Sequence, residues 1–218
     1  MTIISGYVDG MLDGTVPKNK RMQYLSIVSQ EMQRLKILIS SMLNLTKFDN
    51  GTIEIHYQLF PIQDLAFRTI LMFESRLEKR NITLEGLDSE PVQVWGDPDL
   101  IGQVIYNLFE NATKFVNTGG TITFTFKDEP NNTSIAIRNT GAGISKEELP
   151  KIFERFYKSD DSRSHDKTGL GIGLDITKHI VRLHKAQISV SSEEGEYTEF
   201  LIRLPKNCLL YTSDAADE

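Results

Sequence analysis

The sequence predicts an α/β fold, an α/β sandwich in which helices cover one face of a mixed sheet, preceded by a helical hairpin. Three observations support this fold class. Residues 18–48 carry an apolar pattern of helical period, residues 52–115 combine strand-like and helical segments, and residues 121–139 contain two alternating segments typical of an antiparallel hairpin. Helices and strands mixed in this order favour an α/β sandwich.

Composition and charge limit the classes of function. With 39% hydrophobic and 25% charged residues among 218, the chain is typical of a globular core with a helical appendage. No apolar run reaches the roughly 18 residues that a membrane span needs, and no signal peptide follows Met1. The net charge of −6 argues against a nucleic-acid partner, and a single cysteine excludes a disulfide framework.

The last eleven residues, Cys208 to Glu218, differ in character from the rest of the chain. They follow a predicted strand that ends at Pro205. Their sequence, CLLYTSDAADE, resembles the translated transposase adaptor used in sequencing libraries. We therefore expect residues 208–218 to be a non-native tail. The tail holds three acids, so the net charge of the remaining chain is −3.

The first 50 residues are predicted to be helical. Residues 2–12 have helical spacing, and Gly14 and Pro17 separate them from a long helix at residues 18–48. Apolar residues of the long helix alternate three and four apart, as in a heptad seam: Leu25, Val28, Met32, Leu35, Ile39 and Met42.

The heptad seam indicates an assembly of helices. Leu38 and Leu45 broaden the apolar stripe, which favours a four-helix bundle over a two-stranded coiled coil. A helical hairpin contributes two helices, so a four-helix bundle implies a homodimer. Asp49-Asn50-Gly51 ends the helix, and we therefore expect one domain at residues 1–50 and a second at residues 51–207.

The second domain begins with alternating helices and strands. Residues 52–57 alternate like a strand, residues 61–80 form an amphipathic helix, and short strands are expected at residues 82–87 and 92–95. Asp97-Pro98 is a helix N-cap followed by proline at the first helical position, and this helix should run to about residue 115.

The rest of the domain is predicted to be mostly strands. After a turn at residues 117–120, a hairpin is expected from strands at residues 121–127 and 134–139. A glycine-rich polar stretch reaches Lys167. The remaining elements are a helix at residues 173–183 and strands at residues 187–192 and 198–204.

The helix predicted to end near Phe115 carries an informative polar pattern. Its polar residues recur every three or four positions and therefore share one face: Gln103, Asn107, Asn111 and Lys114. An amide oxygen is a suitable ligand for Mg²⁺ that phosphates already hold, and a lysine one turn further can neutralise phosphate oxygens. Taken alone, this face is equally typical of a solvated helix surface.

Two glycine-containing segments are candidates for ligand contact. Asn139-Thr-Gly-Ala-Gly-Ile144 follows a predicted strand, and its asparagine can present an amide to a heterocyclic base. Thr168-Gly-Leu-Gly-Ile-Gly-Leu174 opens a helix, where exposed amides favour a polyphosphate. The second segment lacks both the Gly-Lys-Ser/Thr of a Walker loop and the spacing of a dinucleotide fingerprint.

The stretch between the glycine segments starts with IFERFYK at residues 152–158. Phe153 and Phe156 lie three apart and are expected to hold a short helix against the core. The residues after them are polar, which favours a mobile lid. Four cations of this stretch could reach phosphates or lie in a solvated loop: Arg155, Lys158, Arg163 and Lys167.

The order of these motifs resembles that of the sensor histidine kinases. The strings QVIYNLFENATKF, NTGAGI, FERFYK and TGLGIGLDI are similar to the N box, the first glycine box, the F box and the second glycine box of that family's ATP-binding domain. The resemblance covers residues 1–207. It implies the Bergerat ATP-binding fold, which is shared with gyrase and the MutL-type repair proteins.

The resemblance also implies a site. Asn111 would ligate Mg²⁺, with Asn107 and Lys114 near the phosphates. Phe115 would flank the adenine, and Asn139, where relatives often have an aspartate, would accept a hydrogen bond from the adenine amine. The implied ATP-binding residues are Asn107, Asn111, Lys114, Phe115, Asn139, Gly141, Gly143, Arg155, Lys158, Thr168, Gly169, Leu170, Gly171 and Gly173. One departure is Lys185-Ala186, where relatives usually have two glycines.

The implied reaction is transfer of the ATP γ-phosphoryl group to a histidine. In relatives a His-Glu-Leu-Arg-Thr-Pro string supplies that histidine immediately before the equivalent of Met1, so we expect this chain to lack it. None of the four histidines has the acid-rich context of an acceptor: His56, His165, His179 and His184. The chain should therefore bind Mg-ATP without phosphorylating itself.

The resemblance implies partners and a location as well. These are a homodimer through the helical hairpin, a response-regulator receiver domain, and a cytoplasmic position within a parent anchored in the bacterial inner membrane. Two alternative functions use the same fold. One is a serine-directed kinase of the anti-sigma type, against which the heptad-bearing helix argues, and the other is a non-enzymatic nucleotide-dependent dimer.

Overall fold

The computed structural model describes residues 2–29, 31, 32, 35, 39, 53–158 and 171–206. The chain forms two compact units, Met1–Ile53 and Glu54–Glu218. Among the described helices, none combines the length and the apolar character that crossing a membrane requires.

The first unit is helical wherever it is described beyond its connecting turn. α1 (Thr2–Leu12) precedes the short 3-10 helix η1 (Lys18–Lys20), and the described residues from 21 to 39 are helical. The rings of Tyr7 and Tyr24 lie 4.8 Å apart and join the two helical segments. The predicted helix end near residue 48 lies outside the described residues, and the four-helix bundle stays a prediction.

The second unit is built around a five-stranded sheet of order β2-β4-β5-β7-β6. Its strands are β2 (Thr83–Glu85), β4 (Thr121–Asp128), β5 (Asn132–Thr140), β6 (Gln187–Glu193) and β7 (Tyr197–Pro205). Neighbouring strands are antiparallel except for the parallel pair β2 and β4. A separate two-stranded sheet joins β1 (Gln58–Pro61) to β3 (Gln93–Gly96). The predicted mixed sheet is confirmed.

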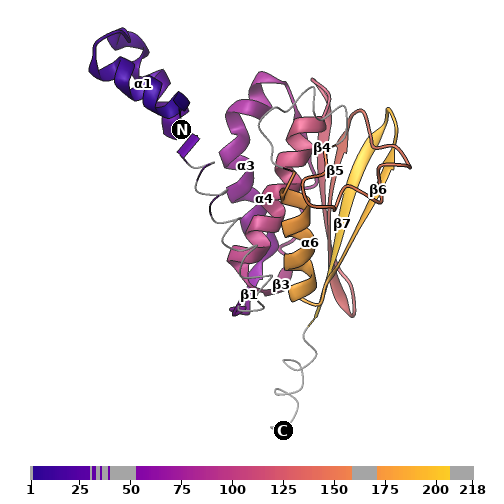
Figure 1. Ribbon diagram of the computed structural model, residues 1–218. Helices are drawn as coiled ribbons and strands as arrows, with labels where there is room; N and C mark the ends of the chain where they lie inside the picture. Colours follow the sequence, from indigo (N-terminus) through magenta and orange to yellow (C-terminus); the bar gives the residue numbers. More distant parts are fainter. Residues whose placement is uncertain are drawn as a thin grey trace. The chain divides into compact units, whose positions relative to one another are not determined.

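The three α-helices that the structure describes in this unit lie on one face of the five-stranded sheet (Figure 1): α3 (Ile62–Lys79), α4 (Pro98–Phe115) and α6 (Gly173–Leu183). The middle helix, α4, contacts both α3 and α6 and also packs on β5. The predicted α/β sandwich is therefore confirmed, with α4 at the centre of its helical layer.

The hydrophobic core lies between α4 and the sheet. Leu108 and Phe109 of α4 are at most 1% exposed. The Phe109 ring lies 5.4 Å from the ring of Phe124 on β4 and 5.4 Å from that of Phe73 on α3. Because β4 alternates apolar and threonine residues, it buries one face completely and leaves the other partly exposed.

A strong N-cap starts α4 at the predicted position. The Oδ1 atom of Asp97 accepts hydrogen bonds from the backbone N–H groups of Asp99 (3.0 Å) and Leu100 (3.1 Å), and Pro98 occupies the first helical position. These bonds satisfy amides that have no partner within the helix. The end of α4 at Phe115 also matches the prediction.

The strand predicted at residues 52–57 is wrong over its described part, because residues 53–57 have no regular secondary structure. The backbone N–H of His56 donates to Asp97 Oδ2 at 3.0 Å, so a side chain takes the place of a strand partner. The Tyr57 ring stacks on Trp95 at 5.9 Å. The alternating pattern therefore reflects packing at the corner between β3 and α4, and the ladder begins only at β1.

His184, directly after α6, is buried against the same corner. Its Nε2 atom accepts the backbone N–H of Asp97 at 3.1 Å, and its Nδ1 atom lies 2.8 Å from the carbonyl oxygen of Ile180. Both contacts are satisfied only by a neutral ring with its hydrogen on Nδ1. Burial lowers the pKa of His184, and the bond to Ile180 and the charge of Asp97 offset this only in part.

Acidification is expected to destabilise the domain through His184. The unfolded chain takes up a proton near pH 6.5, while the folded chain resists protonation because its pKa is lowered, so the free energy of unfolding should fall as the pH decreases below about 6.5, by at most about 1.4 kcal/mol per pH unit. Urea denaturation at several pH values measures this slope. His184→Gln can form both hydrogen bonds without titrating and should flatten it, and an unchanged slope in that variant would contradict the assignment.

Candidate functional site

The polar residues predicted on α4 lie along one face of its last three turns. Asn107 is buried, and Asn111 is half-buried one turn later. The Nζ atom of Lys114 lies 3.4 Å from Glu110 Oε1 in an ion pair along the helix. Phe115, at the helix end, remains 38% exposed. This end of α4 therefore presents an amide, an ammonium group and an aromatic ring.

The first glycine box, residues 139–144, packs directly against the end of α4. Gly141 and Val116 form an isolated antiparallel bridge, and a β-carbon on Gly141 would lie only 2.2 Å from the carbonyl oxygen of Phe115. The backbone N–H of Gly141 donates to the carbonyl of Glu196 at 3.1 Å. Only glycine allows so close an approach between the box and the helix.

On its other side the first glycine box binds the turn between β6 and β7. The backbone N–H of Gly195 donates to the carbonyl of Ala142 at 2.7 Å. Gly143 has a φ of +72°, and a β-carbon there would lie 2.2 Å from the carbonyl oxygen of Glu193. The box is thus fixed between α4 and this turn.

Asn139 lies at the start of the first glycine box and is only 4% exposed. Its Nδ2 atom donates to the carbonyl oxygen of Thr140 at 3.1 Å. A β-carbon on Gly141 would lie 3.4 Å from the same Nδ2 atom. The amide is therefore held against the glycine that packs on α4.

The second glycine box is described from Gly171 onward, and three of its predicted site residues lie outside the described residues: Thr168, Gly169 and Leu170. Gly171 has a φ of +68°, and its carbonyl accepts the backbone N–H of Phe156 at 2.9 Å. The stretch before the box and the box itself are therefore joined by their backbones at this point.

The first turn of α6 is held by α4. Asn107 Nδ2 donates to the carbonyl oxygen of Gly173 at 3.0 Å, and the hydroxyl of Thr177 donates to the same oxygen at 2.9 Å. The N-cap residue of α6 is Ile172, whose side chain makes no capping hydrogen bond. Asn107, which the resemblance places near the phosphates, therefore makes its described contact with the N-terminus of α6.

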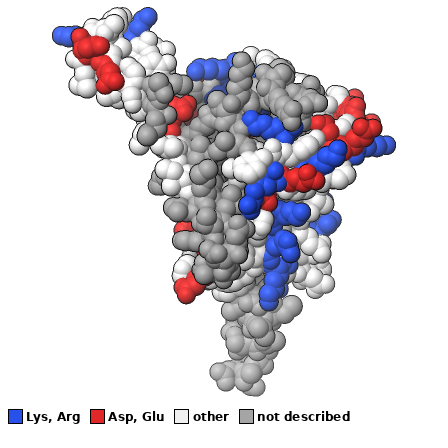
Figure 2. Space-filling model, in the orientation of Figure 1, with Lys and Arg blue, Asp and Glu red and all other residues white. Residues whose placement is uncertain are grey.

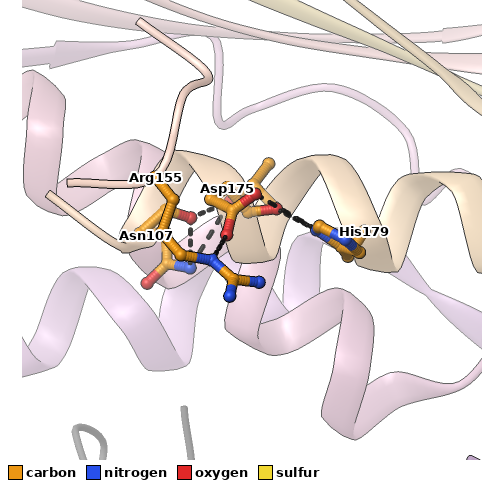
Figure 3. A network of polar contacts seen from close by, with 6 residues as sticks. Asn107, Arg155, Asp175 and His179 are labelled. Carbon is orange, nitrogen blue, oxygen red and sulfur yellow. Dashed lines mark hydrogen bonds and ion pairs between the residues drawn. The ribbon is translucent and has the colours of Figure 1, made fainter. Parts of the chain in front are cut away.

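A polar network continues along α6 (Figure 3). Arg155 Nε lies 2.9 Å from Asp175 Oδ2, and the second oxygen, Oδ1, lies 3.3 Å from His179 Nδ1. Asp175 is 7% exposed. Asp175 carries no distinguishing signal in the sequence, because an acid in the first turn of a helix is an ordinary favourable feature. The sequence feature that could have pointed to Asp175 is Arg155 of the F box, because a basic side chain is often paired with an acidic one.

The F box departs from one expectation. Phe153 contacts the ring of Phe200 at 6.2 Å, as an anchor to the core would. Phe156 was also expected to pack inward in a short helix, and this is wrong: its side chain is 66% exposed, its φ is +65°, and the described segment around it forms turns. Lys158 is half-buried at the end of this segment, whereas Arg163 and Lys167 lie outside the described residues.

Charge is unevenly distributed around the site. Figure 2 shows basic side chains following α6, where Lys178 and Arg182 are exposed. The turn between β6 and β7 instead carries the exposed acids Glu193, Glu194 and Glu196. The negative net charge of the chain therefore does not extend to the face of α6.

The predicted departure at Lys185 has a structural counterpart. Lys185 follows α6 with a φ of +54°, the left-handed region that glycine adopts most readily. Lys185 adopts this conformation at a cost of about 1 kcal/mol for a residue with a β-carbon.

The helical layer, the mixed sheet and the two glycine boxes around α4 define a class of ATPase. Residues 96–207 match the histidine kinase-, DNA gyrase B-, and HSP90-like ATPase family, and the chain belongs to this family. The matched region starts at the last residue of β3 and contains α4, both glycine boxes and α6.

Within this family the similarity is to sensor histidine kinases. Sensor protein SrrB of Staphylococcus aureus is 31% identical over 208 residues, which cover 94% of this chain. The chain spans only 36% of the length of that relative. It thus carries a catalytic ATP-binding domain of the sensor histidine kinase type.

Solved structures show the same likeness. The catalytic domain of histidine kinase ThkA is 28% identical with a TM-score of 0.60, covering 69% of this chain and 96% of that chain. ThkA in complex with response regulator protein TrrA is 25% identical with a TM-score of 0.62, covering 94% and 57%. Acinetobacter baumannii histidine kinase AdeS, at 22% identity and a TM-score of 0.67, covers 94% of each chain and shows the likeness of fold.

Proposed function

We propose that this chain binds Mg-ATP and presents its γ-phosphate to a phosphoacceptor histidine of a two-component sensor kinase. The observation that carries the proposal is that both glycine boxes meet on α4. Gly141 packs against the end of the helix, and Gly173 binds Asn107. A base-binding motif, a phosphate-binding motif and a metal-binding amide therefore converge on one helix.

Asn111 would supply an amide oxygen to Mg²⁺. Among the described residues, no group of three or more His, Cys, Asp or Glu side chains could hold a metal ion. The donors of this part of the chain therefore fit a metal that is held mainly by phosphate oxygens and water, as Mg²⁺ usually is. Bound there, Mg²⁺ would neutralise charge on the transferred phosphoryl group.

The phosphates would lie between the end of α4 and the N-terminus of α6. Lys114 can exchange its partly exposed ion pair with Glu110 for a phosphate oxygen, because a pair that is partly open to solvent contributes little. The N–H groups of the first turn of α6 add the positive end of a helix dipole. We include Lys158 with these phosphate-site residues, and Arg155 belongs to the same site through its contact with Asp175. Such positioning supplies most of the catalysis in phosphoryl transfer.

The adenine would lie over the first glycine box. Asn139 offers a buried amide there, and Phe115 offers an exposed ring at the end of α4. The neutral amide of Asn139 can accept a hydrogen bond from the adenine amine. A carboxylate at this position would accept a stronger, charge-assisted bond, so this chain should hold adenine less tightly than relatives with aspartate.

The described histidines are poorly suited to accept phosphate, and His165 lies outside the described residues. His184 is buried with both ring nitrogens engaged, and His179 Nδ1 lies against Asp175. His56 is exposed, but its surroundings hold no acid-rich acceptor motif. We therefore propose that the acceptor belongs to a segment outside this sequence and that the chain supplies the ATP-binding half of the reaction.

The parent protein would act as a dimer that signals to a response regulator. Three residues of the predicted heptad seam, Leu25, Met32 and Ile39, are 48%, 51% and 50% exposed, which supports their covering by a second copy. The ThkA complex with response regulator TrrA supports a receiver domain as the partner. We also propose that the parent protein is anchored in a membrane and that its ATP-binding portion lies in the cytoplasm.

Calorimetric titration with Mg-ATP and incubation with γ-labelled ATP test this function together. We expect saturable binding of one nucleotide per chain and no label on the chain. Adding a helical hairpin that carries the phosphoacceptor box should place label on the hairpin. Absence of binding would overturn the proposal, and label on any of the four histidines would overturn the assignment of the acceptor to another segment.

A further inference from the structure

We propose that Arg155 is a positioning residue, which must neutralise the charge of Asp175 before a polyphosphate can bind at the N-terminus of α6. The inference rests on the proposed function, and it assigns to Arg155 an effect exerted through Asp175. Nothing in the motif pattern pairs these two residues, which are twenty positions apart.

The contacts define Asp175 closely. Its Oδ2 atom lies 2.9 Å from Arg155 Nε, and its Oδ1 atom lies 3.3 Å from His179 Nδ1. The Asp175 side chain is 9% exposed, while those of Arg155 and His179 are 39% and 31% exposed. The carboxylate is therefore the buried member of the network, and its partners cover it from two sides (Figure 3).

The position of Asp175 creates an electrostatic conflict. It lies in the first turn of α6, two residues after Gly173. A carboxylate there is stabilised by the helix dipole, but it also competes with any anion at the same helix end. A buried charge is poorly screened, so it would repel phosphate oxygens over several ångströms. The guanidinium of Arg155 removes this repulsion by neutralising the carboxylate where it lies.

Asn107 holds the first turn of α6, which carries Asp175, in place against α4. Its Nδ2 atom donates to the Gly173 carbonyl at 3.0 Å, so α4 holds the first turn of α6 from one side. Arg155 adds a second contact to the same turn through Asp175. The helix end can then neither turn its carboxylate away nor open toward solvent without breaking a contact.

A double-mutant cycle on Mg-ATP affinity tests the proposal in the full chain. Arg155→Ala leaves the buried carboxylate uncompensated and should weaken binding about tenfold, the scale of one poorly screened charge. Asp175→Asn keeps an oxygen for Arg155 and removes the charge, so affinity should stay within about threefold of the parent. The double variant should also bind within about threefold of the parent, because no uncompensated charge remains.

Two further variants separate charge from shape. Arg155→Lys keeps a cation near Asp175 and should restore most of the affinity that Arg155→Ala loses. Lys151→Ala removes one exposed positive charge from the same segment without touching Asp175, and it should change affinity by less than about twofold. Thermal unfolding of each variant confirms that the affinities compare folded chains.

The outcomes distinguish this inference from the proposed function. A double variant as weak as Arg155→Ala would mean that Arg155 binds the nucleotide directly, and it would overturn the role of Asp175 alone. Unchanged affinity in Arg155→Ala would also overturn it, while leaving the ATP site in place. A parent chain that binds no Mg-ATP would overturn both.

Discussion

Asn111→Ala is expected to weaken Mg²⁺-dependent ATP binding by about a hundredfold, at the upper end of what the loss of even an indirect metal contact costs. Asn111 is half-buried on α4, one turn after the residue that binds α6, and the shorter side chain leaves no oxygen for the metal. Because the phosphates and the metal bind together, the loss should appear in nucleotide affinity. Calorimetric titration in the presence of excess Mg²⁺ measures it.

Two controls tie the effect of Asn111 to the metal. With Mg²⁺ removed by a chelator, the parent chain and the variant should bind ATP equally weakly. Asn131→Ala changes an exposed asparagine in the β4–β5 turn, at the opposite end of β5 from the glycine box, and should bind like the parent. Equal affinity of parent and Asn111→Ala with Mg²⁺ present would remove Asn111 from the site.

Asp97→Ala is expected to destabilise the second unit by about 3 kcal/mol, which combines the loss of a helix cap with the loss of a buried acceptor. Asp97 is 6% exposed, and its carboxylate accepts hydrogen bonds from the backbone N–H groups of Asp99, Leu100 and His56. Alanine leaves all three donors without that acceptor. Urea denaturation monitored by the fluorescence of Trp95, next to this corner, would report the change.

Substitutions at the same corner separate the contribution of the helix cap from that of the hydrogen bond to His56. Asp97→Asn keeps one oxygen for the cap and loses the acceptor for His56, so it should cost about 1 kcal/mol. Asp99→Ala removes an exposed acid from the same helical turn and should cost at most about 0.5 kcal/mol. If Asp97→Ala were no more destabilising than Asp99→Ala, the cap and the bond to His56 would contribute nothing to stability.

Much of the fold could be predicted because the local sequence patterns, such as helix caps and apolar alternation, agree with how the elements pack in the folded domain. Asp97 and Pro98 mark the start of α4 by cap chemistry that operates within four residues. The apolar alternation of β4 predicts a strand whose buried face is the core face. The family could be predicted from the order of the N box and the glycine boxes, because no single one of these motifs is specific enough.

The parts that could not be predicted depend on contacts between distant residues. Residues 53–57 alternate like a strand, yet the amide of His56 bonds to a side chain forty-one positions away. Arg155 fits a phosphate contact by sequence, but its described partner is Asp175, on a helix that follows the second glycine box. Phe156 has the spacing of an anchor, and its positive φ turns it outward. The spacing of residues along the chain does not reveal which distant residues will contact one another.

The attachment of both glycine boxes to α4 has a consequence for how the site can open. Leu108 and Phe109 of that helix belong to the most buried part of the core, so α4 can fray only when the core itself opens. The contacts that α4 makes with the two glycine boxes should therefore last as long as the folded unit does. Substitutions that loosen the core should shorten the lifetime of these contacts in equal measure.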